Sequence, residues 1–230
     1  MNFKNGLRDG VPVALGYFSV SFAFGLIAVE AGCTGFEAVI ISLTNLTSAG
    51  QFAGVTVITQ MGSYLELALT QCVINSRYAL MAVSLSQKVD EKFKGWWRVL
   101  LGFGITDELF AVAIGQDEAV SREYFGGLIT LPIVGWSGGT LCGAILGNIM
   151  PPIITSALGV ALYGMFIAVV VPKARENFHV FIVVLMALAI SAALYYIPVF
   201  SGISAGFAII ICAVVASAIG AVLFPAEEEV

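Results

Sequence analysis

The sequence predicts an all-α, polytopic membrane helix bundle, and two observations support this fold class. Of its 230 residues, 59% are hydrophobic and only 11% are charged, whereas soluble domains carry about a quarter charged residues. The apolar runs are also much longer than the ~10 alternating residues of an outer-membrane strand. The chain therefore lacks the polar residues for a water-facing surface, and its runs suit membrane helices.

The apolar sequence divides into about eight segments. At a rise of ~1.5 Å per residue, each is long enough to cross ~30 Å of hydrocarbon, the seventh only marginally. We expect one membrane domain over residues 1–230, ending in a helix pair over 179–224. The segments are residues 11–30, 36–61, 63–87, 97–116, 124–149, 153–172, 179–197 and 200–224.

Basic residues predict how the chain is oriented in the bilayer. The loop over 88–98, KVDEKFKGWWR, holds four basic residues and two tryptophans that suit the headgroup level. Lys4 with Arg8, and Lys173 with Arg175, add to this. We therefore expect the N-terminus, loop 88–98 and the C-terminus in the cytoplasm. The net charge of −5 gives no support for nucleic-acid binding.

The three cytoplasmic assignments conflict with the number of apolar segments. Three segments precede Lys88, and three more separate Arg98 from Lys173. An odd number of crossings cannot return a chain to the same side. Two solutions remain open. In the first, one segment of each trio is broken and re-entrant: 36–61, interrupted by TSAGQF at 47–52, and 124–149, interrupted by GWSGG at 135–139. In the second, all segments cross, and 9–95 and 97–175 form an inverted repeat.

The two interrupted centres are rich in glycine and hydroxyl groups. A helix can break at membrane depth only where protein or a water-filled cavity satisfies its backbone, so these centres are candidate walls of a substrate site. Ser48 and Gln51 are the candidate contacts in the first centre. The alternative is close helix packing through small residues.

Three charged residues lie well inside the apolar segments. A charge at the bilayer centre costs ~2.5–3.5 kcal/mol on insertion scales, so such residues usually face a partner or an aqueous path. Arg77 lies eleven residues before Lys88, and Asp107 nine residues after Arg98. In a helical hairpin these separations give depths of about 16 and 14 Å. The spacing predicts a salt bridge from Arg77 to Asp107 or Glu108.

This pair has a structural and a functional interpretation. It can fix the register of two helices, although buried pairs often add little net stability. Alternatively, Arg77 holds a substrate carboxylate, with Asn75 and Tyr78 beside it. A carboxylate at Asp107 or Glu108, next to Thr106, can then carry a coupling proton, because burial favours its neutral form.

Motifs for other chemistries are missing from the sequence. We find no Walker A loop, no HExxH, no GxSxG, and no convincing cluster of metal-ligating residues. The chain is therefore expected to be no enzyme and to bind neither a cofactor nor a metal.

Four stretches, in order, resemble the AzlC family, the large subunit of bacterial branched-chain amino-acid exporters. They are DGVPVALGYFSVSFAFGL (9–26), SAGQF (48–52), NSRYALMA (75–82) and GFGITDELFAV (102–112). The resemblance implies a plasma-membrane exporter of hydrophobic amino acids that works with a small AzlD-like membrane subunit. It assigns the polar positions to Asn75, Arg77, Thr106, Asp107 and Glu108. Relatives often have His after the arginine, where this chain has Tyr78.

The leading hypothesis is thus a secondary exporter subunit that is linked to proton movement. Two alternatives stay open. The chain can be a facilitator or channel for another small solute, which would show downhill flux without exchange. It can also be a structural subunit of a transport complex, which reconstitution with and without the small subunit would reveal.

Overall fold

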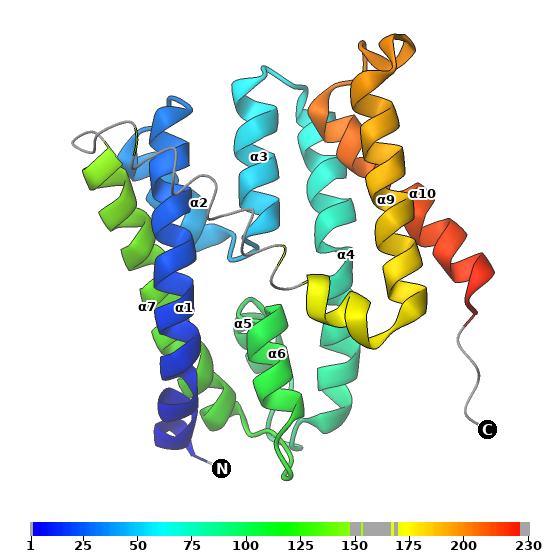
Figure 1. Cartoon of the computed structure of the whole chain (residues 1–230). Helices are drawn as coiled ribbons and strands as arrows, with labels where there is room; N and C mark the ends of the chain where they lie inside the picture. The colour runs from blue at the N-terminus through cyan, green and yellow to red at the C-terminus, as the bar shows by residue number, and fades with distance from the viewer. Residues whose placement is uncertain (1, 148–152, 154–166, 168–169, 226–230) are drawn as a thin grey trace. The chain divides into compact units, whose positions relative to one another are not determined.

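A computed structural model describes residues 2–147, 153, 167 and 170–225, and its regular elements in these ranges are helices (Figure 1). The all-α prediction is confirmed. In the part of the chain that the structure describes, four helices are long and apolar enough to cross a membrane: α1 (Phe3–Glu30), α7 (Arg122–Gly147), α9 (Phe178–Tyr196) and α10 (Ala205–Leu223). The others are α2 (Gly35–Thr44), α3 (Ala49–Thr59), α4 (Tyr64–Lys88), α5 (Trp96–Gly102), α6 (Asp107–Ile114) and the short η1 (Pro198–Phe200). The predicted segment 153–172 falls largely outside the described residues.

The chain forms two compact units, which are described separately. The first combines the described parts of 1–52 and 75–159, and the second those of 53–74 and 160–230. Helices α3 and α4 each contribute to both units.

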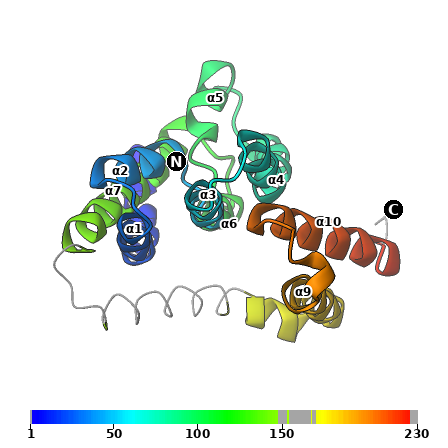
Figure 2. The same cartoon turned by 90° about the horizontal axis from the view of Figure 1, so that it is seen from above.

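Helices α1 and α7 pack along their whole lengths and run in the same direction (Figures 1 and 2). Gly6 of α1 faces the backbone of Tyr124, near the start of α7, and Gly25 faces the backbone of Thr140, near its end. On α7, Gly135, Gly139 and Gly143 face the backbone of α1 in return. Small residues at this spacing allow two membrane helices to approach closely.

The predicted interruption of segment 124–149 at 135–139 is wrong, because α7 is one continuous helix over Arg122–Gly147. Its glycines do not break it. Gly139 instead lies against Phe18 and Ser21 of α1, where a larger residue would collide with them. The alternative of close packing through small residues therefore accounts for this stretch.

Segment 36–61 is broken, as predicted. Thr34 caps the start of α2 with a capping box. Its side-chain hydroxyl accepts a hydrogen bond from the Glu37 backbone N–H, and the Glu37 carboxylate accepts one from the Thr34 backbone N–H. Helix α2 ends at Thr44 and α3 starts at Ala49, so the break lies slightly before the predicted 47–52. Ser48 adopts a left-handed conformation there, with φ of 47°.

The contacts of this segment show that it turns back. Gly35 lies beside Ala144, near the end of α7, whereas Leu46 packs with Tyr17 and Trp136, near the middle of α1 and α7. The ring of Phe52 then meets the ring of Phe24, about two turns further along α1. Residues 35–52 therefore enter from one end of the first unit and begin to return to it.

The second break lies in segment 97–116, where the sequence predicts an unbroken helix, so this prediction is wrong. Helix α5 ends at Gly102 and α6 begins at Asp107. Gly104 in the connection packs against Ile129, and the Thr106 side chain accepts from the Leu109 backbone as the N-cap of α6. A threonine cap followed by two acids is a strong helix start, and it outweighs the apolar run around it.

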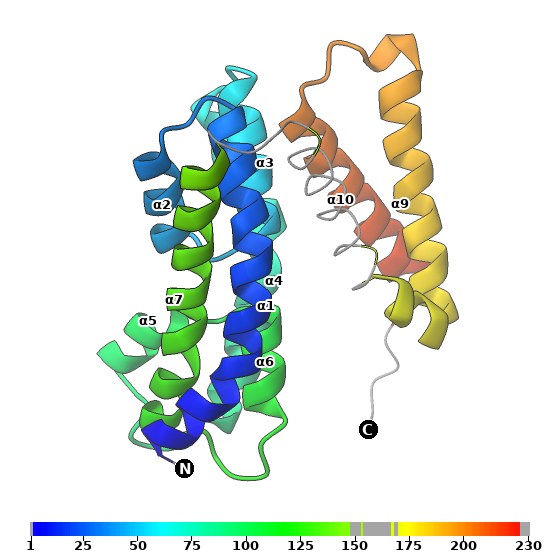
Figure 3. The ribbon, with the colours of Figure 1, turned by 60° about the vertical axis from the view of Figure 1, so that its left-hand side comes forward.

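This segment also turns back, and it does so toward the opposite end of the first unit. The ring of Trp97 lies under the guanidinium of Arg122, at the start of α7. The Lys88 ammonium donates to the carbonyl of Ile114, at the end of α6, over 2.5 Å. Both ends of 97–114 therefore lie near the first turn of α7. Helix α5 packs beside α7 (Figure 3).

The N-terminus and loop 88–98 consequently lie at the same end of the first unit. Gly6 faces Tyr124, and Val89 forms an isolated bridge with Val120. This arrangement agrees with the first topology solution, with 97–116 instead of 124–149 as the second broken segment. The cytoplasmic location of this end stays a prediction, as does the inverted repeat.

In the second unit, α9 and α10 form a hairpin through η1 (Figure 3). The buried Glu66 carboxylate joins the first turn of α4 to the start of α10. It accepts hydrogen bonds from the Ser204 hydroxyl and, over 3.1 Å, from the Gly206 backbone. A carboxylate is favourable at this positive end of a helix dipole.

Candidate functional site

The side chain of Tyr17, near the middle of α1, contacts the start of α6. Its hydroxyl lies 2.5 Å from Oγ1 of Thr106 and 2.6 Å from Oε2 of Glu108. A phenol carries one proton, and an ionised carboxylate can only accept. Tyr17 therefore donates to Glu108, and the Thr106 hydroxyl donates to Tyr17. This arrangement fixes the break between α5 and α6 against α1.

Arg77 of α4 forms an ion pair with Asp107, as the similar depths of the two residues in the sequence predict. The distance between its Nη1 atom and Oδ2 of Asp107 is 2.7 Å. The side chains are 45% and 46% exposed, so the pair is not sealed in the protein. The guanidinium also donates to the Tyr78 hydroxyl over 3.2 Å and lies 5.0 Å from the centre of that ring. Because α6 begins at Asp107, its helix dipole also favours a negative charge here.

The break between α2 and α3 reaches the same region through Trp136 of α7. The Trp136 ring packs edge-on against the Tyr17 ring, with centroids 5.3 Å apart. Its Nε1 atom donates to Oε1 of Gln51 over 2.9 Å. The Gln51 amide donates in turn to Ser42 over 3.0 Å, and Ser42 lies 2.7 Å from the Thr140 hydroxyl.

These contacts form one connected cluster. The Tyr17 hydroxyl contacts the start of α6, after the α5–α6 break. The Tyr17 ring packs on Trp136, which in turn bonds Gln51, just after the α2–α3 break. Gln51 and Trp136 are 1% and 3% exposed, so their hydrogen bond is made away from solvent. A buried polar network of this kind specifies one arrangement of its members.

The structure brings most of the predicted site residues together. Arg77, Tyr78, Thr106, Asp107 and Glu108 are adjacent, and Gln51 is joined to them through Trp136 and Tyr17. Ser48 lies at the α2–α3 break, and its buried hydroxyl oxygen has no hydrogen-bond partner among the described residues. Asn75 is half-buried on α4, two residues before Arg77. The roles of these residues stay predictions.

The polar roles of four residues in this cluster were missed by sequence reasoning. They are Tyr17, Ser42, Trp136 and Thr140. A buried tyrosine or tryptophan usually finds a hydrogen-bond partner, so Tyr17 and Trp136 near the middle of apolar segments carried a usable signal. Nothing in the sequence indicates that Ser42 and Thr140 meet.

The cluster places a guanidinium, two carboxylates and two half-helix starts close together. Helix α3 begins at Ala49 and α6 at Asp107, each directly after a break. Such an arrangement is complementary to a small molecule that carries both an acidic and a basic group. No group of metal-ligating side chains occurs in the part of the chain that the structure describes.

Fold and site thus define a helical membrane protein in which two broken segments turn back and meet at a mixed-charge cluster. The family model described as AzlC protein matches residues 12–150, and the chain belongs to this family.

Known relatives cover most of the chain. It is 30% identical over 174 residues to the inner membrane protein YgaZ of Escherichia coli, spanning 72% of this chain and 71% of the relative. It is 29% identical over 175 residues to an uncharacterized membrane protein of Archaeoglobus fulgidus, covering 75% and 76% of the two chains. A similar protein of Helicobacter pylori is 26% identical over 153 residues, or 64% of each chain. No solved structure matches.

Proposed function

We propose that the chain is the large subunit of a secondary transporter that exports branched-chain and other hydrophobic amino acids. One observation carries the proposal: two broken helices meet at Tyr17, beside a half-exposed Arg77–Asp107 pair and Glu108. Transporters often bind substrates where helices are discontinuous, because half-helix ends and freed backbone groups are available there.

An amino-acid zwitterion fits the charges of this cluster. Arg77 offers paired donors to the substrate carboxylate, and Asp107 or Glu108 accepts from the substrate ammonium group. Binding then exchanges the Arg77–Asp107 pair for contacts with the substrate. The apolar substrate side chain takes no part in these charge contacts.

The same exchange links substrate to protons in this proposal. An ionised Asp107 can accept from the substrate ammonium group, whereas a protonated Asp107 has lost the charge that attracts it. A proton on Asp107 and a bound substrate therefore exclude each other. Proton entry can then be exchanged for substrate exit.

The cellular setting is also part of the proposal. The E. coli relative is named as an inner membrane protein, and we infer the same membrane for this chain. The family resemblance adds a small AzlD-like subunit as partner. A facilitator or channel for another small solute is the competing function.

The test is efflux of labelled valine and leucine from preloaded cells that express the chain with and without its small subunit. We expect saturable efflux that falls with a protonophore, together with counterflow in vesicles. Efflux that runs only downhill, without saturation or exchange, would establish the channel instead. Unchanged efflux by Arg77→Ala would show that the described cluster is not the transport site.

A further inference from the structure

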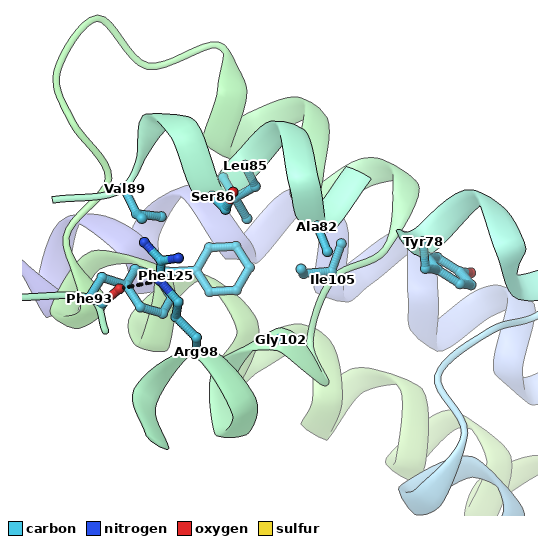
Figure 4. A pocket seen from close by; sticks show the side chains of 10 residues that line it. All are labelled: Tyr78, Ala82, Leu85, Ser86, Val89, Phe93, Arg98, Gly102, Ile105 and Phe125. Atoms are coloured by element: carbon cyan, nitrogen blue, oxygen red, sulfur yellow. Dashed lines mark hydrogen bonds between the residues drawn. The ribbon is translucent and has the colours of Figure 1, made fainter. Parts of the chain in front are cut away.

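An apolar groove runs along α4, from Tyr78 beside the ion pair toward Arg98. Its volume is about 270 Å³, and Tyr78, Ala82, Leu85 and Val89 line one wall (Figure 4). These residues follow one face of the helix over eleven positions, which is about 16 Å. The opposite wall includes Gly102, Ile105 and Phe125. The groove is thus long and apolar.

A single guanidinium lies at one end of this groove. Arg98 lies near Val89 and Phe93, whereas Tyr78 is at the other end (Figure 4). Its Nε atom donates to the Phe93 carbonyl over 2.8 Å, which holds the side chain there. That bond uses one of the five N–H donors of an arginine. Among the described residues, no carboxylate forms an ion pair with Arg98.

The residues around Arg98 are those of a membrane interface. Trp96 and Trp97 are exposed, as are the apolar Val99 and Leu100. Tryptophan is enriched at the headgroup level of bilayers. Helix α5 therefore exposes the apolar and aromatic side chains expected of a helix at a membrane surface.

The loop over 88–98 carries four basic residues against two acidic ones, Asp90 and Glu91, so its net charge favours an anion. Lys92 and Lys94 are exposed in the loop that precedes Arg98. The Asp90 carboxylate in the same loop accepts from the backbone of Lys92 and of Phe93, over 3.1 and 2.8 Å. The negative charge of Asp90 is thus already hydrogen-bonded within the loop. Basic pockets between membrane helices commonly hold anionic lipid headgroups.

We propose that this groove binds an anionic phospholipid, with the phosphate at Arg98 and one acyl chain along α4 toward Tyr78. An acyl chain matches an apolar groove of about 16 Å, whereas the side chain of valine or leucine would fill only part of it. The lipid would contact α4, α5 and α7 together and so hold α5 in place. The phosphate end at Arg98 lies at the opposite end of the groove from Tyr78, which contacts Arg77 of the proposed amino-acid site.

The test uses the purified full chain in detergent, titrated with phosphatidylglycerol or with phosphatidylcholine of the same acyl chains. Native mass spectrometry counts the lipid molecules retained. We expect phosphatidylglycerol to be retained in preference. Arg98→Gln should weaken its binding about fivefold, because one basic residue near the headgroups is lost. Lys94→Gln removes the same charge outside the groove wall and should have a smaller effect.

A second variant tests the acyl-chain position. Gly102 lines the groove, and a Cβ added there would meet no atom within 4 Å, so Gly102→Leu is chosen to occupy part of the groove. It should weaken both lipids. Gly16→Leu is the matched control, since a Cβ added at Gly16 of α1 also meets no atom within 4 Å. Melting temperatures establish that all four variants fold.

Three results would overturn the proposal. The first is equal retention of the two lipids by the unchanged protein. The second is equal binding of phosphatidylglycerol by Arg98→Gln and Lys94→Gln. The third is a Gly102→Leu variant that keeps lipid but changes the oligomeric state or the amino-acid preference, which would make the groove a protein interface or a substrate pocket.

Discussion

Arg77 and Asp107, thirty positions apart in the chain, form an ion pair of 2.7 Å between α4 and α6. Both side chains stay nearly half exposed, and Asp107 is also the first residue of a half-helix. Neither property is needed to fix the register of two helices. Both are expected of groups that must exchange partners.

The first prediction separates a transport role from a structural one. Arg77→Gln and Asp107→Asn should each reduce valine efflux about ten- to hundredfold, because each removes a charged contact to the substrate. The double variant should remain inactive. If the pair only joins helices, removing both charges should instead restore efflux, since replacing both partners of a pair is often neutral.

The Arg122–Glu123 pair provides the control for this series. Its distance is also 2.7 Å and its exposure is similar, but it lies at the start of α7, away from the cluster. Arg122→Gln should leave efflux close to that of the unchanged protein. Membrane insertion of each variant is checked by its amount in isolated membranes.

The second prediction concerns the hydroxyl of Tyr17. Tyr17→Phe removes the contacts with Thr106 and Glu108 and keeps the ring packing on Trp136. We expect a stability loss of about 1–3 kcal/mol, since Thr106 loses a buried partner. Efflux should fall more than that of a control variant, Tyr124→Phe, which removes a hydroxyl bound to Asp9 elsewhere in the unit. Equal efflux by the two variants would contradict a role of Tyr17 in the site.

The salt bridge could be predicted from the sequence, although one assumption behind it was wrong. The depth count placed Arg77 and Asp107 at similar levels, and the pair is present. The count assumed that 97–116 is one helix, yet α5 and α6 are separated by 103–106. The depth estimate still holds because Asp107 lies directly after the turn at 103–106. This turn is the part of the segment that lies farthest from loop 88–98.

The identity of the broken segments was only partly predictable. Glycine and hydroxyl content marked both 47–52 and 135–139, but these residues have different partners. Gly139 faces the backbone of α1, so it serves close packing, whereas Ser48 takes a left-handed conformation at a true break. Sequence composition cannot reveal which helix faces a glycine. The Thr-Asp-Glu start of α6 was a local signal that the apolar run obscured.

The third prediction tests whether the two halves of the cluster are coupled. Trp136→Phe removes the N–H donor to Gln51 but keeps a ring against Tyr17. Gln51→Leu removes the acceptor, and it also leaves Ser42 without its donor. In a double-mutant cycle of unfolding free energies, we expect a coupling of about 0.5–3 kcal/mol, as for residues in one hydrogen-bonded network. A coupling near zero would show that the Trp136–Gln51 bond does not connect the halves energetically.

The last prediction uses two adjacent glycines on α7. A side chain at Gly139 would collide with Phe18 and Ser21 of α1, whereas one at Gly138 would meet no atom within 4 Å. Both changes to alanine raise helix propensity by about the same amount, up to ~1 kcal/mol. Gly139→Ala should nevertheless destabilise the protein, because overpacking costs about 1–3 kcal/mol, and Gly138→Ala should be neutral or stabilising. The difference between the two melting temperatures therefore measures the α1–α7 contact alone. Since Tyr17 and Trp136 lie on these helices, efflux should fall with Gly139→Ala and persist with Gly138→Ala. Equal melting temperatures for the two variants would mean that α1 and α7 are not packed backbone to backbone.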